Sequence, residues 1–371
     1  MKSRAMLIRL LASIGAIAFA VGVSAVVLLL VDVNPLEAFG AMFSYGTRVD
    51  SAISIVNRAV PLYLSALAVA VGFQMGLFNI GVEGQYRIAA LIAGYAGAAI
   101  ALPAVLHVFV IIIIAMIVGA LWASIAAILK ATRGVHEVIS TIMLNFIATG
   151  LGAWLLANYL REEVEGSLQV RTAEIPESGR MPSLNPVLEG LGVTVPAGSD
   201  LQSFVLIAIL AGIGYYVLIW RTRFGYDLRA SGANPSAAAA AGIDRKRMIL
   251  SAMGLSGAFA GLVVMGPVLG FSHRYTDDLP SELGFTGIAV ALVGRNKPAG
   301  MAFAALLFAY LNRSAQILDL RGIPKEIEVI IGGVIILAVV IAYELARRFI
   351  EAQQVRASAA EDRAPTEEVS A

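Results

Sequence analysis

The chain alternates between long apolar stretches and short polar connections. The first apolar stretch, from Leu10 to Val31, contains no charged residue and is preceded by Lys2, Arg4 and Arg9. Further apolar stretches follow at 59–78, 88–106, 108–129, 139–160, 203–220, 248–271, 285–294, 298–315 and 327–346. A helix of about 20 mostly apolar residues crosses a bilayer core of about 30 Å and satisfies its own backbone in lipid. The pattern therefore predicts an all-α, polytopic transmembrane helical bundle with about ten spans.

Three stretches allow more than one interpretation. The basic start and Ala18-Phe19-Ala20 would suit a cleaved signal peptide, but the apolar run continues well past them, which favours a permanent span. Residues 285–315 are broken by Arg295 to Pro298, so they predict either two short spans or one span and a re-entrant piece. Residues 43–58 are more amphipathic and predict a segment at the membrane interface.

The charged loops predict the orientation. The loop 221–247 carries six basic and two acidic residues, whereas the loop 161–202 is acidic and includes Glu163 and Glu165. The positive-inside rule places the loop 221–247 in the cytoplasm and the loop 161–202 outside. In a ten-span arrangement the other basic loops also fall inside and both termini are cytoplasmic. We therefore expect one permease domain over 1–350 and a disordered cytoplasmic tail over 351–371.

The composition removes several classes of function. Apolar residues make up 58% and charged residues 14% of the chain, against about 25% charged in soluble domains. The net charge of +1 gives no basic field for nucleic acid, and the chain has no cysteine and only three, scattered histidines. The sequence also lacks a Walker A loop and the H-E-x-x-H and G-x-S-x-G motifs. We expect no catalytic residues, no metal site and no bound cofactor, so energy for uphill transport must come from a partner or an ion gradient.

Polar residues inside apolar stretches are the candidate path residues, because they are costly in a membrane and usually face a cavity or the protein interior. Asn79, Glu83 and Gln85 form the densest group and lie among four glycines between 72 and 84. This run predicts either a broken or re-entrant helix that borders the translocation path, or a short cytoplasmic turn with Glu83 in solvent. Asn145 predicts either a hydrogen bond between helices or a substrate contact.

The inner loop 221–247 has the order expected of a docking element. Gly232 and Ala233 precede Asn234-Pro235, a helix N-cap followed by proline at the first helical position. Five alanines follow, and Gly242 ends the predicted helix before Asp244 and Arg245. A short helix of small residues flanked by charges suits the docking of a soluble partner. The alternative is a connecting loop with one helical turn.

Several motifs together resemble a known permease family. They are Phe78 to Gln85, His136 to Asn145, Gly232 to Pro235 leading to Ala241 to Asp244, Ser256 to Gly261, and Gly284 to Gly294. In this order they resemble the permeases of ATP-binding-cassette importers of the branched-chain amino acid, ribose and simple-sugar type. They look most similar to the nucleoside-importing branch that works with basic-membrane-lipoprotein binding proteins.

The resemblance implies a type II importer-like permease of the bacterial cytoplasmic membrane that pairs with a second permease subunit to form a heterodimer. It also implies a separate subunit that binds ATP and an extracytoplasmic substrate-binding lipoprotein. Gly232, Asn234, Pro235, Gly242, Asp244 and Arg245 would then belong to the coupling loop. The long acidic outer loop and the alanine-rich coupling helix depart from the family pattern. Nucleosides, ribosides and simple sugars remain alternative substrates, and an ion-coupled secondary transporter with Glu83 as coupling carboxylate is the alternative function.

Overall fold

The structure is a computed structural model that describes residues 32–162 and 169–319, residues 15, 18–19 and 21–30, and scattered positions between 330 and 348. The chain divides into two units, residues 45–313 and the two chain ends, 1–44 with 314–371. The expected tail at 351–371, the basic residues before Leu10, and Glu163 and Glu165 of the acidic loop lie outside the described residues. All the candidate path and coupling residues belong to the unit 45–313, which is described first.

The described part of this unit is helical, without a strand. Its long helices are α3 (Val49–Gln74), α4 (Val82–Ala99), α5 (Ala104–Arg133), α6 (Glu137–Leu155) with the π-helical turn η1 (Leu156–Leu160), α8 (Phe204–Arg221), α11 (Arg245–Gly261) and the start of α14 (Pro298–Asp319). The short helices are η2 (Glu177–Gly179), α7 (Asn185–Gly190), α9 (Arg223–Ala233), α10 (Pro235–Ala240), α12 (Met265–Pro267), η3 (Val268–Ser272) and α13 (Leu283–Val293).

The second unit consists of the chain ends. Its described elements include residues 21–30, which are helical, and most of α2 (Pro35–Gly46). Asn34 precedes α2, and its side-chain oxygen accepts a hydrogen bond from the backbone N–H of Leu36 at 3.0 Å. This contact satisfies one of the free donors at the start of the helix.

Six described helical segments are long and apolar enough to cross a membrane. A seventh is obtained if residues 21–30 and α2, which meet at 117°, count as one bent span. The predicted number of about ten is therefore not confirmed, and much of the predicted spans 10–31 and 327–346 lies outside the described residues. The helix α13 has 11 residues, or about 16 Å, which is half of a bilayer core.

The structure corrects two predicted boundaries. The amphipathic stretch 43–58 is not a separate interfacial segment, because Val49 to Gln74 form one helix whose middle is almost completely buried. The helix α4 begins at Val82, before the predicted apolar stretch at 88, and contains Glu83 and Gln85. Both helices begin with polar residues that find partners in other parts of the bundle, and a hydropathy pattern does not register such partners.

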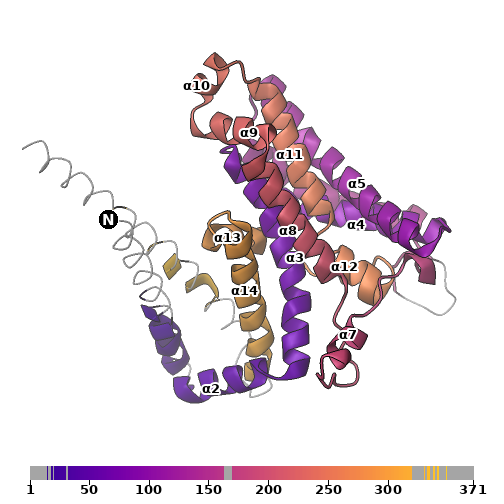
Figure 1. Ribbon diagram of the computed structural model, residues 1–371, viewed down its shortest axis with the longest axis vertical. Coiled ribbons are helices and arrows are strands. Elements are labelled where there is room, and N and C mark those ends of the chain that lie inside the picture. Colours follow the sequence, from indigo (N-terminus) through magenta and orange to yellow (C-terminus); the bar gives the residue numbers. More distant parts are fainter. Residues whose placement is uncertain are drawn as a thin grey trace, which may run out of the picture. The chain divides into compact units, whose positions relative to one another are not determined.

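The helices α5 and α11 lie side by side and approach at small residues (Figure 1). A Cβ atom added to Gly119 would lie closer than 3.0 Å to the carbonyl oxygen of Gly257, and one added to Gly257 would lie equally close to that of Gly119. Gly261 meets the carbonyl oxygen of Ala115 in the same way. This spacing of small residues at every fourth position allows close helix packing, a common means of association between membrane helices.

The ends of the bundle are built differently. Figure 1 shows α9 and α10 at one end of α8 and α7 near the opposite end. At the α7 end, backbone pairing joins Arg171 to Thr276 and Ser183 to Gln202. His107, at the start of α5, is fully buried there and contacts the Ser178 hydroxyl at 2.9 Å and the Gly97 carbonyl oxygen at 3.0 Å. The part of the acidic loop around Thr172, Ile175 and Gly179 is thus packed onto the helices, whereas most of residues 186–199 are exposed.

Candidate functional site

The first part of the site is the turn between α3 and α4. Asn79 lies in this turn, is fully buried, and donates from Nδ2 to Ser256 Oγ at 2.8 Å and to Gln85 Oε1 at 3.1 Å. Its Oδ1 accepts from the backbone N–H of Gly81 at 2.9 Å and from Gln85 Nε2 at 3.1 Å. The Ser256 hydroxyl in turn donates to the carbonyl oxygen of Ala68 at 2.6 Å. One buried amide therefore ties together α3, α4 and α11.

The second part of the site is contributed by α6. The Asn145 side chain accepts from the backbone N–H of Gly84 at 2.8 Å and donates to the carbonyl oxygen of Ile80 at 3.0 Å. A Cβ atom at Gly84 would lie 2.9 Å from both Asn145 and Ala148, so only glycine permits this approach. Asn145 thus forms the hydrogen bonds between helices that the sequence allowed, and both ends of its amide are used within the protein.

The third part of the site is a carboxylate. Glu83 is 7% exposed, so the predicted alternative of a turn with Glu83 in solvent is wrong. Its Oε1 accepts from the Tyr86 hydroxyl at 2.6 Å, Arg87 Nε at 3.0 Å and the backbone N–H of Glu282 at 3.0 Å. Its Oε2 accepts from the backbone N–H of Gly284 at 3.0 Å. Glu282 and Gly284 begin α13, so Glu83 caps the N-terminus of a helix about 200 residues away in the chain.

This cap is electrostatically favourable. The first N–H groups of a helix have no partner within the helix, and the helix dipole adds partial positive charge at this end. The Glu83 carboxylate on α4 accepts hydrogen bonds from the free N–H groups of α13 and places a negative charge at the positive end of its dipole. Arg87, four residues after Glu83 on the same helix, balances the remaining charge through the ion pair. The arrangement fixes the first turns of α4 and α13 against each other.

The chain reaches α13 through a non-helical segment that runs along α4. Tyr275 packs on Gly94, where an added Cβ would lie 3.2 Å from the Tyr275 Cβ. Further along, the Tyr86 hydroxyl donates to the carbonyl oxygen of Pro280 at 3.0 Å. The order of these contacts shows that residues 275–282 descend along α4 from its C-terminal half to its N-terminus. The half-length α13 is followed by a tight turn at 294–297 and then by α14, an arrangement that fits either prediction for 285–315, two short spans or one span and a re-entrant piece.

The loop 221–247 has the local structure predicted for it around α10. Asn234 caps α10 by accepting from the backbone N–H of Ala237 at 3.0 Å, and Pro235 is the first helical residue. Gly242 has φ +81° and ends the turn, which confirms the predicted helix and its two ends. Asp244 caps α11 through the N–H groups of Lys246 and Arg247, a role that the sequence did not reveal. All residues of α10 except Ala238 are exposed.

The loop 221–247 also touches the start of the turn that contains Asn79. Gly232, the residue before the end of α9, packs on the backbone of Gln74 and Met75 so closely that a Cβ would overlap the Gln74 carbonyl oxygen. Gly76, with φ +70°, lies opposite the Gly232 carbonyl oxygen. The exposed α10 therefore follows directly on α9, whose C-terminal end makes backbone contact with the C-terminal end of α3.

Further members of the site are not among the candidate residues that the sequence predicts. Glu137, at the start of α6, is buried and forms an ion pair with Lys130 Nζ at 2.7 Å while facing the backbone N–H of Phe78. The spacing of Glu83 and Arg87 could have indicated their pairing, because residues four apart face each other on a helix. Nothing local indicates that Ser256 would join Asn79. No group of three or more metal-binding side chains occurs in the part of the chain that the structure describes.

The apolar bundle, with its polar groups turned inward and an exposed helix at one end, defines a multi-pass membrane protein of the permease class. The chain belongs to the family described as branched-chain amino acid transport system / permease component, whose model matches residues 51–340. It is a permease component of an ATP-binding-cassette transporter, as its relatives are.

Three curated relatives cover most of the chain. The guanosine ABC transporter permease protein NupP of Bacillus subtilis is 37% identical over 80% of this chain and 82% of its own length. The glucose ABC transporter permease protein TsgB13 of Haloferax volcanii is 34% identical over 86% of this chain and 83% of its own length. The nucleoside ABC transporter permease protein NupB of Lactococcus lactis is 32% identical, with 97% of both chains covered.

Proposed function

We propose that this permease component imports nucleosides or related ribosides, with simple sugars as the second candidate class. The observation that carries the proposal is the 97% mutual coverage with a permease named for nucleosides, together with 37% identity to one named for guanosine. Simple sugars are the second candidate class because one relative is named for glucose. A sugar ring with several hydroxyl groups is the chemistry that these substrate classes share.

The energy for import would come from a separate subunit that binds and hydrolyses ATP, and the chain itself would have no enzymatic activity and no cofactor. We infer that α10 docks on that subunit, with Gly232, Asn234, Pro235, Gly242, Asp244 and Arg245 forming the coupling loop. The exposure of α10 and the contact of Gly232 with the end of α3 support this inference. Displacement of α10 would act directly on the turn before α4.

We further propose that Asn79, Glu83, Gln85 and Asn145 border the translocation path by fixing its broken backbone. Their polar atoms bond to each other and to backbone groups at the starts of α4 and α13, which supports a positioning role. Substrate contacts would then come from residues next to these two buried helix starts. The ion-coupled secondary transporter is not favoured by the family or by the occupied hydrogen-bond positions of Glu83.

The assembly would contain a second permease subunit, as a heterodimer, and an extracytoplasmic substrate-binding lipoprotein. The excess of basic residues in the loop 221–247 supports a cytoplasmic position for that loop and for both termini, in a bacterial cytoplasmic membrane. The described outer loop would face the binding protein, and residues 1–350 would together form the permease domain.

Uptake of labelled guanosine, ribose and glucose into cells with and without this gene tests the substrate class. Inactivation of the partner ATPase should abolish the uptake, whereas an uncoupler that leaves cellular ATP intact should not. Uptake that persists without the ATPase and collapses with the uncoupler would refute ATP-driven import. Loss of glucose uptake alone would refute the nucleoside assignment and leave the sugar class.

A further inference from the structure

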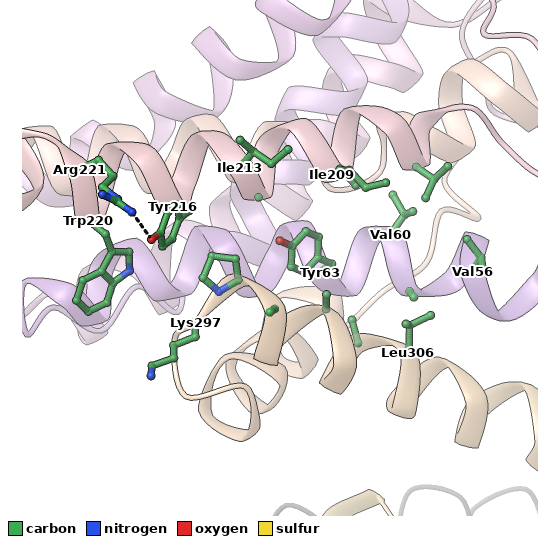
Figure 2. Close-up of a pocket in the computed structure, with 18 residues that line it drawn as sticks. Val56, Val60, Tyr63, Ile209, Ile213, Tyr216, Trp220, Arg221, Lys297 and Leu306 are labelled. Atoms are coloured by element: carbon green, nitrogen blue, oxygen red, sulfur yellow. Dashed lines mark hydrogen bonds between the residues drawn. The ribbon is translucent and has the colours of Figure 1, made fainter. Parts of the chain in front are cut away.

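A large groove lies between α3, α8 and α14 within the unit 45–313 (Figure 2). Its volume is about 1050 Å³. Apolar side chains such as Val56, Val60, Ile209, Ile213 and Leu306 form most of its wall. Ile209 and Ile213 are each more than half exposed, so the described residues of this unit leave this surface uncovered.

One end of the groove differs from the rest. Figure 2 shows Tyr216, Trp220, Arg221 and Lys297 at this end, and Val56 and Leu306 toward the other. Arg221 Nη2 donates to the Tyr216 hydroxyl at 3.3 Å, and its guanidinium lies 5.7 Å from the centre of that ring. Arg221 and Lys297 are exposed, and neither forms an ion pair with any carboxylate of the described residues.

We propose that the groove binds an anionic phospholipid of the cytoplasmic leaflet. The phosphate lies between Arg221 and Lys297, and the acyl chains follow the apolar wall. Two cations at the end of an apolar groove complement an anionic headgroup, and basic pockets between membrane helices bind such headgroups. Tyrosine and tryptophan beside them are typical of the depth where headgroups meet acyl chains.

The dimensions suit an acyl chain. The lining residues on α8 extend from Val205 to Arg221, about 24 Å along the helix. One leaflet is about 15 Å deep, so the groove is long enough for an acyl chain to lie along it over the whole depth of the leaflet. A polar ligand such as a nucleoside would leave most of its hydrogen-bonding groups against carbon, which is unfavourable. The choice of leaflet rests on the proposed cytoplasmic position of the loop 221–247. Arg221 is also two residues before α9, so a bound headgroup would hold the start of the coupling loop.

Native mass spectrometry of the assembled transporter, with phosphatidylglycerol titrated against phosphatidylcholine, measures the binding. The double variant Arg221→Gln/Lys297→Gln should weaken phosphatidylglycerol binding by about 25-fold, because each cation near a membrane surface contributes a factor of about five to the affinity. The control variant Arg223→Gln/Lys246→Gln removes the same charge from two exposed residues outside the groove and should leave the affinity unchanged. Equal loss in both variants, or loss in neither, would overturn the proposal.

A second measurement reports on the groove itself. The chain contains no cysteine, so Ile213→Cys provides a single site for a fluorescent label. Brominated phosphatidylglycerol should quench this label more strongly than brominated phosphatidylcholine does, and the double variant should abolish the difference. A label shielded from both lipids would show that a protein helix covers the groove, and protection by guanosine would show a substrate cavity; either result overturns the proposal. Lipid binding is read without transport, so this test and the uptake test can fail separately.

Discussion

The cap that Glu83 places on α13 predicts the effect of a single-atom change. Glu83→Gln keeps the size of the side chain but replaces one acceptor oxygen with an NH2 donor. If the remaining oxygen keeps Tyr86, Arg87 and the Glu282 N–H, the new NH2 group points at the Gly284 N–H, which was bonded at 3.0 Å. The variant therefore loses a hydrogen bond to a charged acceptor and the charge that balanced Arg87.

The magnitude follows from these two losses. A hydrogen bond to a charged group contributes about 1.5–3 kcal/mol, and removal of one partner of a buried ion pair costs about 3–5 kcal/mol. The Arg87 side chain is 18% exposed, so solvent reduces the second term. We expect a total loss of about 3–5 kcal/mol in the free energy of unfolding. Glu83→Ala should cost at least as much, because it leaves all four donors without this acceptor.

Thermal unfolding of the purified protein in lipid nanodiscs, followed by tryptophan fluorescence, provides the assay. The matched control is Glu282→Gln, which makes the same chemical change one residue before α13 on an exposed side chain. Glu83→Gln should unfold several degrees below the wild type and the control should unfold with the wild type. A Glu83→Gln protein as stable as the control would refute the capping argument. If that protein had also lost ion-dependent uptake, Glu83 would be a coupling carboxylate instead.

Three further substitutions test other contacts. Gly257→Ala should destabilise the bundle by about 1–3 kcal/mol, because the added Cβ meets the carbonyl oxygen of Gly119. The control Gly254→Ala lies on the same helix, where the nearest atom is 3.9 Å from the added Cβ, and should keep the melting temperature of the wild type. Asn234→Ala removes the cap of α10, worth about 1 kcal/mol locally, and should lower substrate-stimulated ATP hydrolysis of the assembled transporter while the melting temperature stays constant. Gly232→Ala should also lower this stimulation, since it separates α9 from the end of α3; unchanged stimulation in both variants would contradict coupling through this loop.

The sequence predicts those parts of the structure that depend on neighbouring residues. The order Asn234-Pro235 followed by alanines and Gly242 contains everything that α10 needs to begin and end, and the helix forms as expected. Periodic apolar residues likewise predict most of the long helices, although not all of their ends. A local pattern is sufficient where the stabilising contact lies within one or two helical turns.

The contacts that the sequence does not predict join distant residues. The start of α4 was expected at 88 because Glu83 and Gln85 look unfavourable in an apolar helix. Gln85 is bonded to Asn79, whose own partner Ser256 lies 177 residues further along the chain. Glu83 is bonded to the backbone of Gly284, about 200 residues away, and only the folded bundle brings these residues together. A buried polar residue costs little once it is hydrogen-bonded, so the hydropathy of the segment alone misplaces the helix start.

The surroundings of Glu83 also bear on how the transporter is energised. A carboxylate that couples an ion gradient must bind and release its ion during each cycle, so its other partners must tolerate both forms. Around Glu83 the partners are donors: two backbone N–H groups of α13, the guanidinium of Arg87 and the hydroxyl of Tyr86. A proton on Glu83 would displace one of these donors and weaken the cap of α13. The Tyr86 hydroxyl can reverse its role and accept the proton, but protonation would still remove the negative charge that strengthens the bonds from Arg87 and from the two N–H groups of α13. The geometry is better suited to a permanent cap, which agrees with our proposal that the energy for transport comes from a separate subunit docked on α10.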